Sequence, residues 1–398
     1  MRITRYSILD TQNLLTTNHE PRTTNHEPLT TNYEPRTMNH FEDFRNRAIV
    51  QKLVAEIHRI SRRPVSFMEV CGGHTHAIRR FGIPALLPEH ITLLSGPGCP
   101  VCVTSVSYVD RAVAYSRLPD VILATFGDMI RIPGSSSSLD REKARGHDVR
   151  IVWSALDAVK IAEENPGKKV ILLGIGFETT APVTAAAVRY AHEKKVKNFY
   201  IFSSHKIMPP AMEALIDEGV PLDGYLAPGH VSTVTGTSIY RNIAEKYGKA
   251  CVISGFEPVD ILESVLMLVR QVEEHRPAVE IQYRRVVRPE GNPRAQQVMN
   301  EVYGLRDDWW RGLGVLAASG LAPRERYAAH DAEKRIPVEV EPAVEPRGCI
   351  CGEVLKGVKR PVDCPLFDGK CTPSTPVGAC MVSPEGACQA WHKYKLDA

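Results

Sequence analysis

The fold is decided by the stretch VILLGIGFETTAPVTAAAVRYAHEK at residues 170–194. Its first six residues, Val170–Ile175, are almost continuously apolar, which predicts a strand that is covered on both faces. A polar turn follows, and from Pro182 to Lys194 the apolar residues recur at helical spacing. A buried strand followed by a helix is the unit from which parallel α/β sheets are built.

The same alternation continues on both sides of this stretch. Further strands are predicted at Val65–Val70, Ile91–Ser95, Val121–Phe126, Val149–Trp153, Phe199–Ser203, Gly224–Ala227 and Ala250–Ser254. Helical patterns between them cover Val106–Ser116, Trp153–Glu164 and Pro210–Glu218. The sequence therefore predicts an α/β protein with parallel sheets.

A chain of 398 residues is too long for one ordinary core, which indicates two or three domains. The Pro, Gly and Ser residues of Ile132–Ser138 suggest a boundary between two similar α/β domains, at 41–131 and 132–256. Residues 257–398 are predicted to form a return segment and a small C-terminal domain. From about Pro323 this part is rich in Pro, Gly and Cys, which is typical of a domain held by a metal centre.

The composition excludes several classes of protein. The hydrophobic share of 43% and the charged share of 24% are those of a soluble globular protein. The formal net charge of +3 gives no field that would collect nucleic acid or an anionic membrane. No apolar run is long enough for a transmembrane helix, and the first residues, MRITRYSILDTQ, lack a signal-peptide cleavage site. We therefore expect a cytoplasmic protein.

The N-terminus contains a seven-residue repeat, which reads TTNHEPR at 16–22, TTNHEPL at 23–29 and TTNYEPR at 30–36. Its a and d positions are polar and each unit contains Pro, so it does not fit a coiled coil. We predict that residues 1–40 are a disordered tail. Met38 lies just before an amphipathic stretch, and we expect it to be the natural start, with residues 1–37 an upstream extension.

The first group of possible metal ligands follows the strand predicted at Val65–Val70. Cys71 comes directly after this strand and precedes a predicted Gly-Gly turn, His74 and His76. Ligands bind at the carboxyl ends of strands in open α/β sheets, and glycines allow the backbone to approach a bound group closely. Cys71, His74 and His76 offer one soft and two borderline metal ligands within six residues. We interpret this cluster as functional rather than as a packed cysteine with two loop histidines.

The second group is the C-x-x-C of Cys99 and Cys102, which follows the strand Ile91–Ser95 and precedes a helix expected to start near Thr104. A C-x-x-C between a strand and a helix is typical of a reversible dithiol/disulfide pair. The second C-x-x-C of a zinc site is absent. We therefore favour a redox pair over half of a metal site.

The third group is formed by six of the ten cysteines, which fall in the last fifty residues. These are Cys349, Cys351, Cys364, Cys371, Cys380 and Cys388. Four thiolates are sufficient for an iron–sulfur cluster, although the spacing alone does not select which four. A four-cysteine zinc site remains an alternative, but the wide and unequal gaps do not fit a C-x2-C ribbon.

Three polar turns follow other predicted strands. They are GFETTAP at 176–182, SSHK at 203–206 and PGHVS at 228–232. The first lacks the Walker spacing and the third glycine of a dinucleotide-binding fingerprint. If all three lie at the carboxyl edge of one sheet, they suggest a cleft there.

Several of these segments resemble signature sequences of the HypD-type maturation factors of nickel–iron hydrogenases. The matching segments are FMEVCGGHTHAI (67–78), GPGCPVC (96–102), the three polar turns, GFEPVDIL (255–262), CPLFDGKCTP (364–373) and PVGACMVSPEGAC (376–388). They occur in the order of the family and cover roughly 41–394. The resemblance implies two similar α/β domains and a third domain with a 4Fe–4S cluster.

The resemblance also implies a function, which is to serve as the scaffold on which the Fe(CN)2CO group of the hydrogenase is assembled. It implies a complex with a small HypC-type chaperone, a HypE-type donor of cyanide, and an indirect relation to the hydrogenase large subunit. By position, Cys71 would bind the nascent iron, His74 would support that site, and Cys99 and Cys102 would be the redox pair.

The cluster ligands implied by the family spacing C-x14-C-x6-C-x16-C are Cys349, Cys364, Cys371 and Cys388. Cys351 and Cys380 are then extra, and Glu385 is implied to belong to the functional set. The alternative functions are an iron–sulfur thiol/disulfide oxidoreductase, which would not need Cys71, and a zinc-stabilised binding protein without redox chemistry.

Overall fold

The computed structural model describes residues 41–395, so the predicted disordered tail at 1–40 lies outside the described residues. The strands are β1 (Val65–Glu69), β2 (Ile91–Ser95), β3 (Val121–Thr125), β4 (Val149–Ile151), β5 (Lys169–Gly176), β6 (Phe199–Lys206), β7 (Gly224–Pro228), β8 (Ala250–Ser254), β9 (Val279–Ile281), β10 (Tyr303–Trp310) and β11 (Gly314–Pro323). Every strand predicted from the sequence is present, with ends that differ by a few residues.

Most of the remaining described chain is helical. The α-helices are α1 (Arg47–Ile60), α2 (Gly72–Arg80), α3 (Pro100–Val103), α4 (Val106–Ser116), α5 (Leu139–Ala144), α6 (Ala155–Glu164), α7 (Ala181–Glu193), α8 (Met208–Asp217), α9 (Gly229–Thr235), α10 (Arg241–Glu245), α11 (Pro258–Glu273), α12 (Pro293–Val302), α13 (Ala332–Arg335), α14 (Cys351–Leu355), α15 (Ala379–Val382) and α16 (Ala387–Lys393). Short 3-10 helices cover Phe41–Arg45, Ile83–Leu86, Gly127–Arg131, Ser238–Tyr240, Glu325–His330 and Pro361–Asp363.

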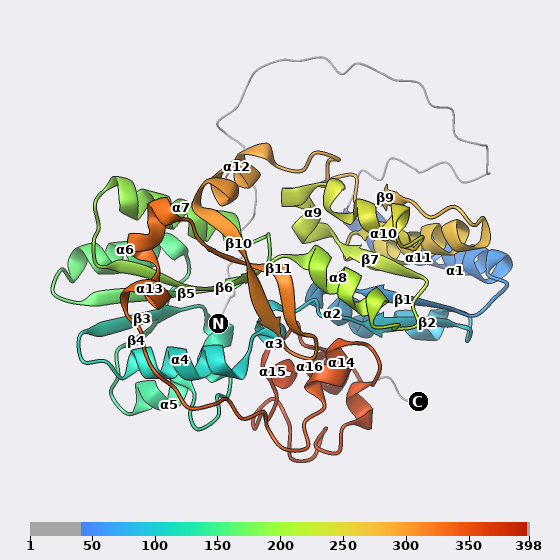
Figure 1. Cartoon of the computed structure of the whole chain (residues 1–398). Helices are drawn as coiled ribbons and strands as arrows, with labels where there is room; N and C mark the ends of the chain where they lie inside the picture. Colours follow the sequence, from blue (N-terminus) through green and yellow to red (C-terminus); the bar gives the residue numbers. More distant parts are fainter. Residues whose placement is uncertain (1–40, 396–398) are drawn as a thin grey trace. The chain divides into compact units, whose positions relative to one another are not determined.

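The strands form two sheets (Figure 1). The first has the order β2-β1-β7-β8-β9 and is entirely parallel. The second has the order β10-β11-β6-β5-β3-β4, in which β4, β3, β5 and β6 are parallel while β11 is antiparallel to both of its neighbours. The α/β class with mainly parallel sheets is therefore confirmed.

Strands from both predicted α/β domains contribute to both sheets. β3 precedes the predicted boundary at Ile132 but pairs with β4 and β5, which follow it. β7 follows the boundary but pairs with β1. The chain passes from the first sheet to the second between β2 and β3, and returns between β6 and β7. The predicted boundary at Ile132 therefore does not separate the two sheets. Strand pairing depends on contacts between segments that are far apart in the chain.

The antiparallel hairpin β10–β11 was not predicted, and it changes the interpretation of SSHK. All four residues of this motif lie in β6 rather than in a turn, and β11 pairs with His205 and Lys206 at Leu321 and Gly320. A hairpin from a segment about 100 residues further along the chain gives the end of β6 a hydrogen-bonding partner. Such a non-local partner has no signal in the local pattern of β6.

The segment after Ile132 is anchored by a buried carboxylate. Glu142 in α5 is 0% exposed and accepts hydrogen bonds from both Arg117 guanidinium nitrogens at 3.0 Å and from Arg145 at 2.7 Å. The hydroxyl of Ser137 also donates to it. The hydrogen bonds from Arg117 are the main reason why the pKa of Glu142 falls to about 2. Glu142 therefore ties α5 to the end of α4.

We expect Glu142→Gln to lower the free energy of unfolding by about 2 kcal/mol at pH 7, because it leaves two arginines without their anion. A carboxylate whose pKa is depressed stabilises the fold above its unfolded value, near 4.5, and loses this effect as the pH falls toward 2. The difference between variant and wild type in thermal unfolding should thus be smaller at pH 3 than at pH 7. Glu325→Gln, on an exposed ion pair with Lys334, is the control and should change little. An equal loss at both pH values would contradict the assignment.

Candidate functional site

Cys71 and the C-x-x-C segment meet where β1 and β2 end. The two strands are in register, from Val65 opposite Ile91 to Glu69 opposite Ser95. Past their ends the Gly72 N–H donates to the Gly98 carbonyl at 3.0 Å. A β-carbon on Gly98 would lie 2.2 Å from the backbone nitrogen of Cys71, so only glycine permits this approach. The GPGC loop thus packs directly against the residue predicted to bind iron.

The two glycines after Cys71 do not form the predicted turn. They are the first residues of α2, and Cys71 is the residue that caps this helix. A β-carbon on Gly72 would lie 2.3 Å from the β-carbon of Glu385, and one on Gly73 would lie 3.0 Å from the Phe256 ring. The glycines therefore allow Glu385, from the C-terminal segment, and Phe256 to approach Cys71.

A residue that the sequence analysis missed, Glu69, organises this corner. Its buried carboxylate accepts hydrogen bonds from the Cys71 N–H at 3.0 Å and from the Thr75 hydroxyl. Burial raises the pKa of Glu69 to about 8. The available signal was the single charge in the otherwise apolar run Phe67–Val70, which indicates a buried carboxylate.

The surroundings of Cys71 disfavour a bare thiolate. Burial is the main reason why the pKa of Cys71 rises to about 12, and the negative charge of Glu385 is the second. Glu69 acts in the same direction. The metal-free Cys71 is therefore a thiol at neutral pH.

His74 is buried, and its environment fixes its tautomer. Its Nε2 lies 2.9 Å from the Gly255 carbonyl and 3.2 Å from that of Ser254. Carbonyls only accept hydrogen bonds, so Nε2 carries the proton and Nδ1 keeps its lone pair. Nδ1 is buried and has no hydrogen-bond partner. Burial lowers the pKa of His74 to about 4, and the ring stacks on Phe256 at 4.5 Å. His74 is thus a neutral imidazole with one free lone pair.

The structure does not bring His76 to the same place. It is two positions after His74 in α2, and residues at this spacing point to different sides of a helix. Its Nε2 lies 2.8 Å from the hydroxyl of Tyr394, just after α16. Three residues further along α2, the guanidinium of Arg79 lies over the Trp391 ring at 3.7 Å. His76 and Arg79 thereby connect α2 to α16, the helix that carries Cys388.

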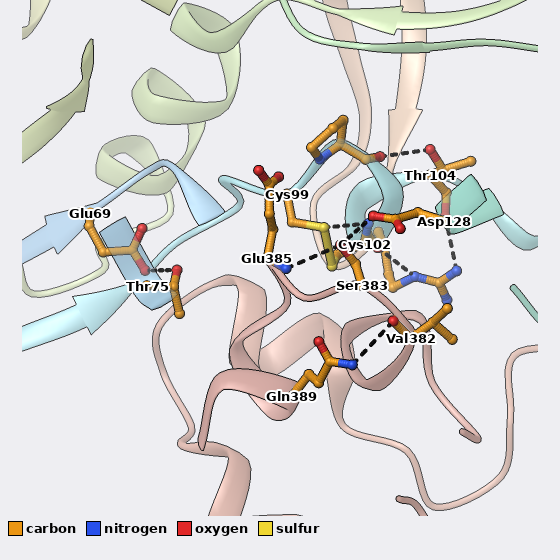
Figure 2. The surroundings of a disulfide bond; sticks show 12 residues. Glu69, Thr75, Cys99, Cys102, Thr104, Asp128, Val382, Ser383, Glu385 and Gln389 are labelled. Carbon is orange, nitrogen blue, oxygen red and sulfur yellow. Dashed lines mark hydrogen bonds between the residues drawn. A yellow bond between two sulfur atoms is a disulfide. The ribbon is translucent and has the colours of Figure 1, made fainter. Parts of the chain in front are cut away.

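Cys99 and Cys102 form a disulfide, and Figure 2 shows its surroundings. The helix expected to start near Thr104 is α4, which is capped by Ser105. An additional short helix, α3, begins at Pro100 and contains Cys102. Cys99 is its cap, and the Cys102 N–H lies 3.2 Å from the Cys99 sulfur. Near the disulfide, the Ser383 hydroxyl donates to Asp128 at 3.4 Å and accepts from the Glu385 N–H at 3.3 Å. Glu385 is therefore held beside both the disulfide and α2.

The six C-terminal cysteines line a single pocket. Its other lining residues are Ile350, Val354, Leu366, Phe367, Gly378 and Met381. Within residues 41–395 no three His, Cys, Asp or Glu side chains converge as ligands of one metal ion. A cubane cluster does not require such convergence, because each of its four cysteines binds a different iron. The pocket unites all four predicted cluster ligands, Cys349, Cys364, Cys371 and Cys388.

The two cysteines that the family spacing leaves over also belong to this pocket. Cys351 and Cys380 are buried, and the Cys351 thiol interacts with the thiols of both Cys349 and Cys380. Hydrogen bonding from Cys349 is the largest cause of a Cys351 pKa far below its usual range. Cys380 in turn interacts with Cys388. The sequence did not indicate that these extra cysteines would touch the predicted ligands.

The three polar turns do not share one edge, contrary to the prediction. GFETTAP and SSHK belong to the second sheet, whereas PGHVS follows β7 of the first, where His230 stacks on Phe256 at 4.0 Å. His205 interacts with Thr184 and Ser203, each at 3.1 Å. The buried side chains of the second sheet are thus used for internal contacts.

In the described part of the chain, none of the helices has the length and apolarity needed to cross a membrane. Residues 48–395 match the family model HypD, described as "Hydrogenase formation hypA family". The chain is 46% identical over 364 residues to hydrogenase maturation factor HypD2 of Bradyrhizobium diazoefficiens, which covers 89% of this chain and 96% of that protein.

Similar agreement extends to more distant organisms. Hydrogenase maturation factor HypD of Cupriavidus necator is 44% identical over 367 residues, covering 89% of this chain and 97% of that protein. A putative hydrogenase expression/formation protein of Methanocaldococcus jannaschii is 43% identical over 355 residues, covering 89% and 99%. The predicted resemblance is thus confirmed over nearly the whole described chain, and the protein belongs to the HypD family of hydrogenase maturation factors.

Proposed function

We propose that this protein is the scaffold on which the Fe(CN)2CO group of nickel–iron hydrogenase is assembled. In this proposal Cys71 binds the nascent iron, which is cargo, and Cys99 and Cys102 supply electrons for the transfer of cyanide. The partners are a small HypC-type chaperone and a HypE-type cyanide donor, and the hydrogenase large subunit receives the product indirectly.

The observation that carries the proposal is the meeting of three thiol groups on contacting elements. Cys71 caps α2, whereas Cys99 caps α3 and Cys102 lies within it. A hydrogen bond between Gly72 and Gly98 joins the starts of these two helical segments. α2 packs against α16, and α3 packs against α15. These two helices carry Cys388 and Cys380 of the six-cysteine pocket. The three groups of cysteines to which the proposal gives these roles therefore lie on elements that contact one another.

Charge and ligand chemistry support iron as the cargo. The same carboxylates that raise the pKa of Cys71 would be neutralised by a divalent cation, and a thiol that coordinates such a cation loses its proton outright. His74, in α2, adds a lone pair on Nδ1 that has no hydrogen-bond partner. Cyanide and carbon monoxide are π-acceptors that need electron-rich iron, and a thiolate provides the electron density.

The dithiol suits the electron balance of cyanide transfer. In a thiocyanate-like donor, R–S–C≡N, breaking the S–C bond to release cyanide requires two electrons and leaves a thiolate. Oxidation of Cys99 and Cys102 to their disulfide provides two electrons and releases two protons. The cyanide carbon then binds the iron. One turnover of the thiol pair therefore balances the transfer of one cyanide ligand.

The C-terminal pocket fits a 4Fe–4S cluster by its donor set, since it is lined by six cysteines and apolar side chains. Cys349, Cys364, Cys371 and Cys388 would hold the cluster, which when bound supplies single electrons. Cys351 and Cys380 would not bind the cluster. Cys380 lies in α15, which packs against α3, and its thiol interacts with Cys388.

We expect Cys71→Ala to abolish hydrogenase maturation while leaving the C-terminal iron and sulfide content unchanged. The infrared spectrum of the anaerobic wild-type protein, purified with its small partner, should contain metal–cyanide and metal–carbonyl bands that vanish in this variant. Cys251→Ala is the matched control, because Cys251 is buried in β8, away from these groups. Normal maturation in Cys71→Ala would refute the scaffold function and favour the thiol oxidoreductase.

Glu385→Gln should accelerate alkylation of Cys71 in the metal-free protein at pH 8. Removal of the Glu385 charge lowers the pKa of Cys71, and one pKa unit changes the thiolate fraction about tenfold. We expect the rate of alkylation to increase about 3- to 10-fold. Mass spectrometry of the peptide that contains Cys71 measures this rate. Glu353→Gln, an exposed residue of α14, is the control. An unchanged rate would show that Glu385 does not act on this thiol.

Cys364→Ala should remove the brown colour of the purified protein and lower its thermal transition, because formation of a metal centre contributes folding free energy. Optical absorption, iron and sulfide analysis, and thermal unfolding measure these effects. Cys251→Ala, outside the six-cysteine pocket, is the control for the loss of a cysteine and should keep the colour and the iron content. Retention of the full iron content and of the transition would count against Cys364 as a ligand.

A further inference from the structure

The turn between β10 and β11 contacts the C-x-x-C helix with an arginine. Arg311 is only 5% exposed, although it lies in a hairpin turn. Its Nε donates to the Cys102 carbonyl at 3.0 Å and its Nη2 to the Thr104 carbonyl at 2.9 Å. Its backbone N–H donates to the Val103 carbonyl at 2.9 Å. One residue thus binds three consecutive carbonyls at the end of α3.

The same turn contacts the cysteine-rich segment from its other side. A β-carbon on Gly312 would lie 2.6 Å from the carbonyl of Gly352, the residue after Cys351. The remaining guanidinium nitrogen of Arg311 pairs with Glu345, just before that segment. The turn is therefore packed between α3, which contains Cys102, and α14, which begins at Cys351.

These contacts and the disulfide hold the same segment. α3 has only four residues, so its last carbonyls have no partners within the helix and need donors from elsewhere. In the oxidised protein the disulfide constrains this segment covalently, and all the contacts of Arg311 are made in that conformation. In the reduced protein the covalent constraint is gone, and a segment that can open makes these contacts for only part of the time. The contacts of the planar guanidinium fork of Arg311 therefore contribute more to the oxidised form than to the reduced form.

We infer that Arg311 is a positioning residue that holds α3 in its disulfide-bonded conformation and so lowers the reduction potential of the Cys99–Cys102 pair. The inference rests on the proposed function in one respect, namely that this pair is redox-active. The reaction is exchange with an external dithiol: the Cys99–Cys102 S–S bond is cleaved and two thiols form, while the external dithiol loses two electrons and two protons and becomes a disulfide.

The test is the equilibrium of the full-length protein with buffers of reduced and oxidised dithiothreitol. After differential alkylation, trypsin releases the peptide Phe81–Arg111, whose only cysteines are Cys99 and Cys102. For Arg311→Met we expect the equilibrium to shift about tenfold toward the dithiol, which corresponds to a potential about 30 mV more positive. Arg311→Lys keeps the charge but not the fork, and should shift the equilibrium less.

The matched control is Arg324→Met, because Arg324 follows the same hairpin but donates to the Asn300 carbonyl at 2.8 Å and does not contact α3. This variant should have the wild-type potential. A purely structural role of Arg311 predicts equal destabilisation of the oxidised and reduced proteins in thermal unfolding and no shift in potential, and that result would overturn the inference. If Arg311→Met does not fold, a wild-type potential in Arg311→Lys overturns it instead.

The same measurement distinguishes failure of the inference from failure of the proposed function. A wild-type pair that exchanges normally, with unchanged potentials in the Arg311 variants, refutes only the role of Arg311. A wild-type pair that does not exchange with the dithiol refutes both this role and the redox step of the proposed function.

Discussion

The site depends on two adjacent parallel strands that end in register. Because Glu69 lies opposite Ser95, the segments that follow β1 and β2 emerge together, and the Gly96 N–H donates to the Glu69 carbonyl at 2.8 Å. Cys71 and the GPGC loop follow directly. A shift of one residue in this register would turn every side chain of a strand to the opposite face and separate the thiols. The glycines of both segments then allow a closer approach than any residue with a β-carbon.

Around Cys71, burial and nearby negative charge both raise the pKa of the thiol. Burial raises the pKa of Glu69 and of Cys71, and Glu385 raises that of Cys71 further. The cost of placing carboxylates near a thiol is reduced when a cation joins them. His74, held neutral by burial, adds a lone pair without adding charge. These features support the proposal that a cation binds beside Cys71.

The cysteine-rich segment is held by contacts with the α/β body at several points. Its helices α14, α15 and α16 are short, and helices of this length gain little stability by themselves. α16 is attached to α2 through Tyr394 and Trp391, α15 packs on α3, and the hairpin turn packs on α14. The elements that carry Cys71 and the dithiol are therefore also the elements that support the six-cysteine pocket. A change at one thiol group has a direct structural route to the others.

The sequence by itself determined the α/β class, strands β1 to β8, the family, and the three groups of cysteines. These features depend on local composition, apolar periodicity and motif spacing, which a single segment carries. Only the tertiary structure decided that the sheets exchange strands across Ile132, that β6 continues through His205 and Lys206, and that the hairpin β10–β11 exists. It also decided that Glu69 and Arg311 support the thiols, whereas His76 contacts Tyr394. The physical reason is that strand partners, burial and hydrogen-bond partners are set by residues far apart in the chain, and no local pattern records them.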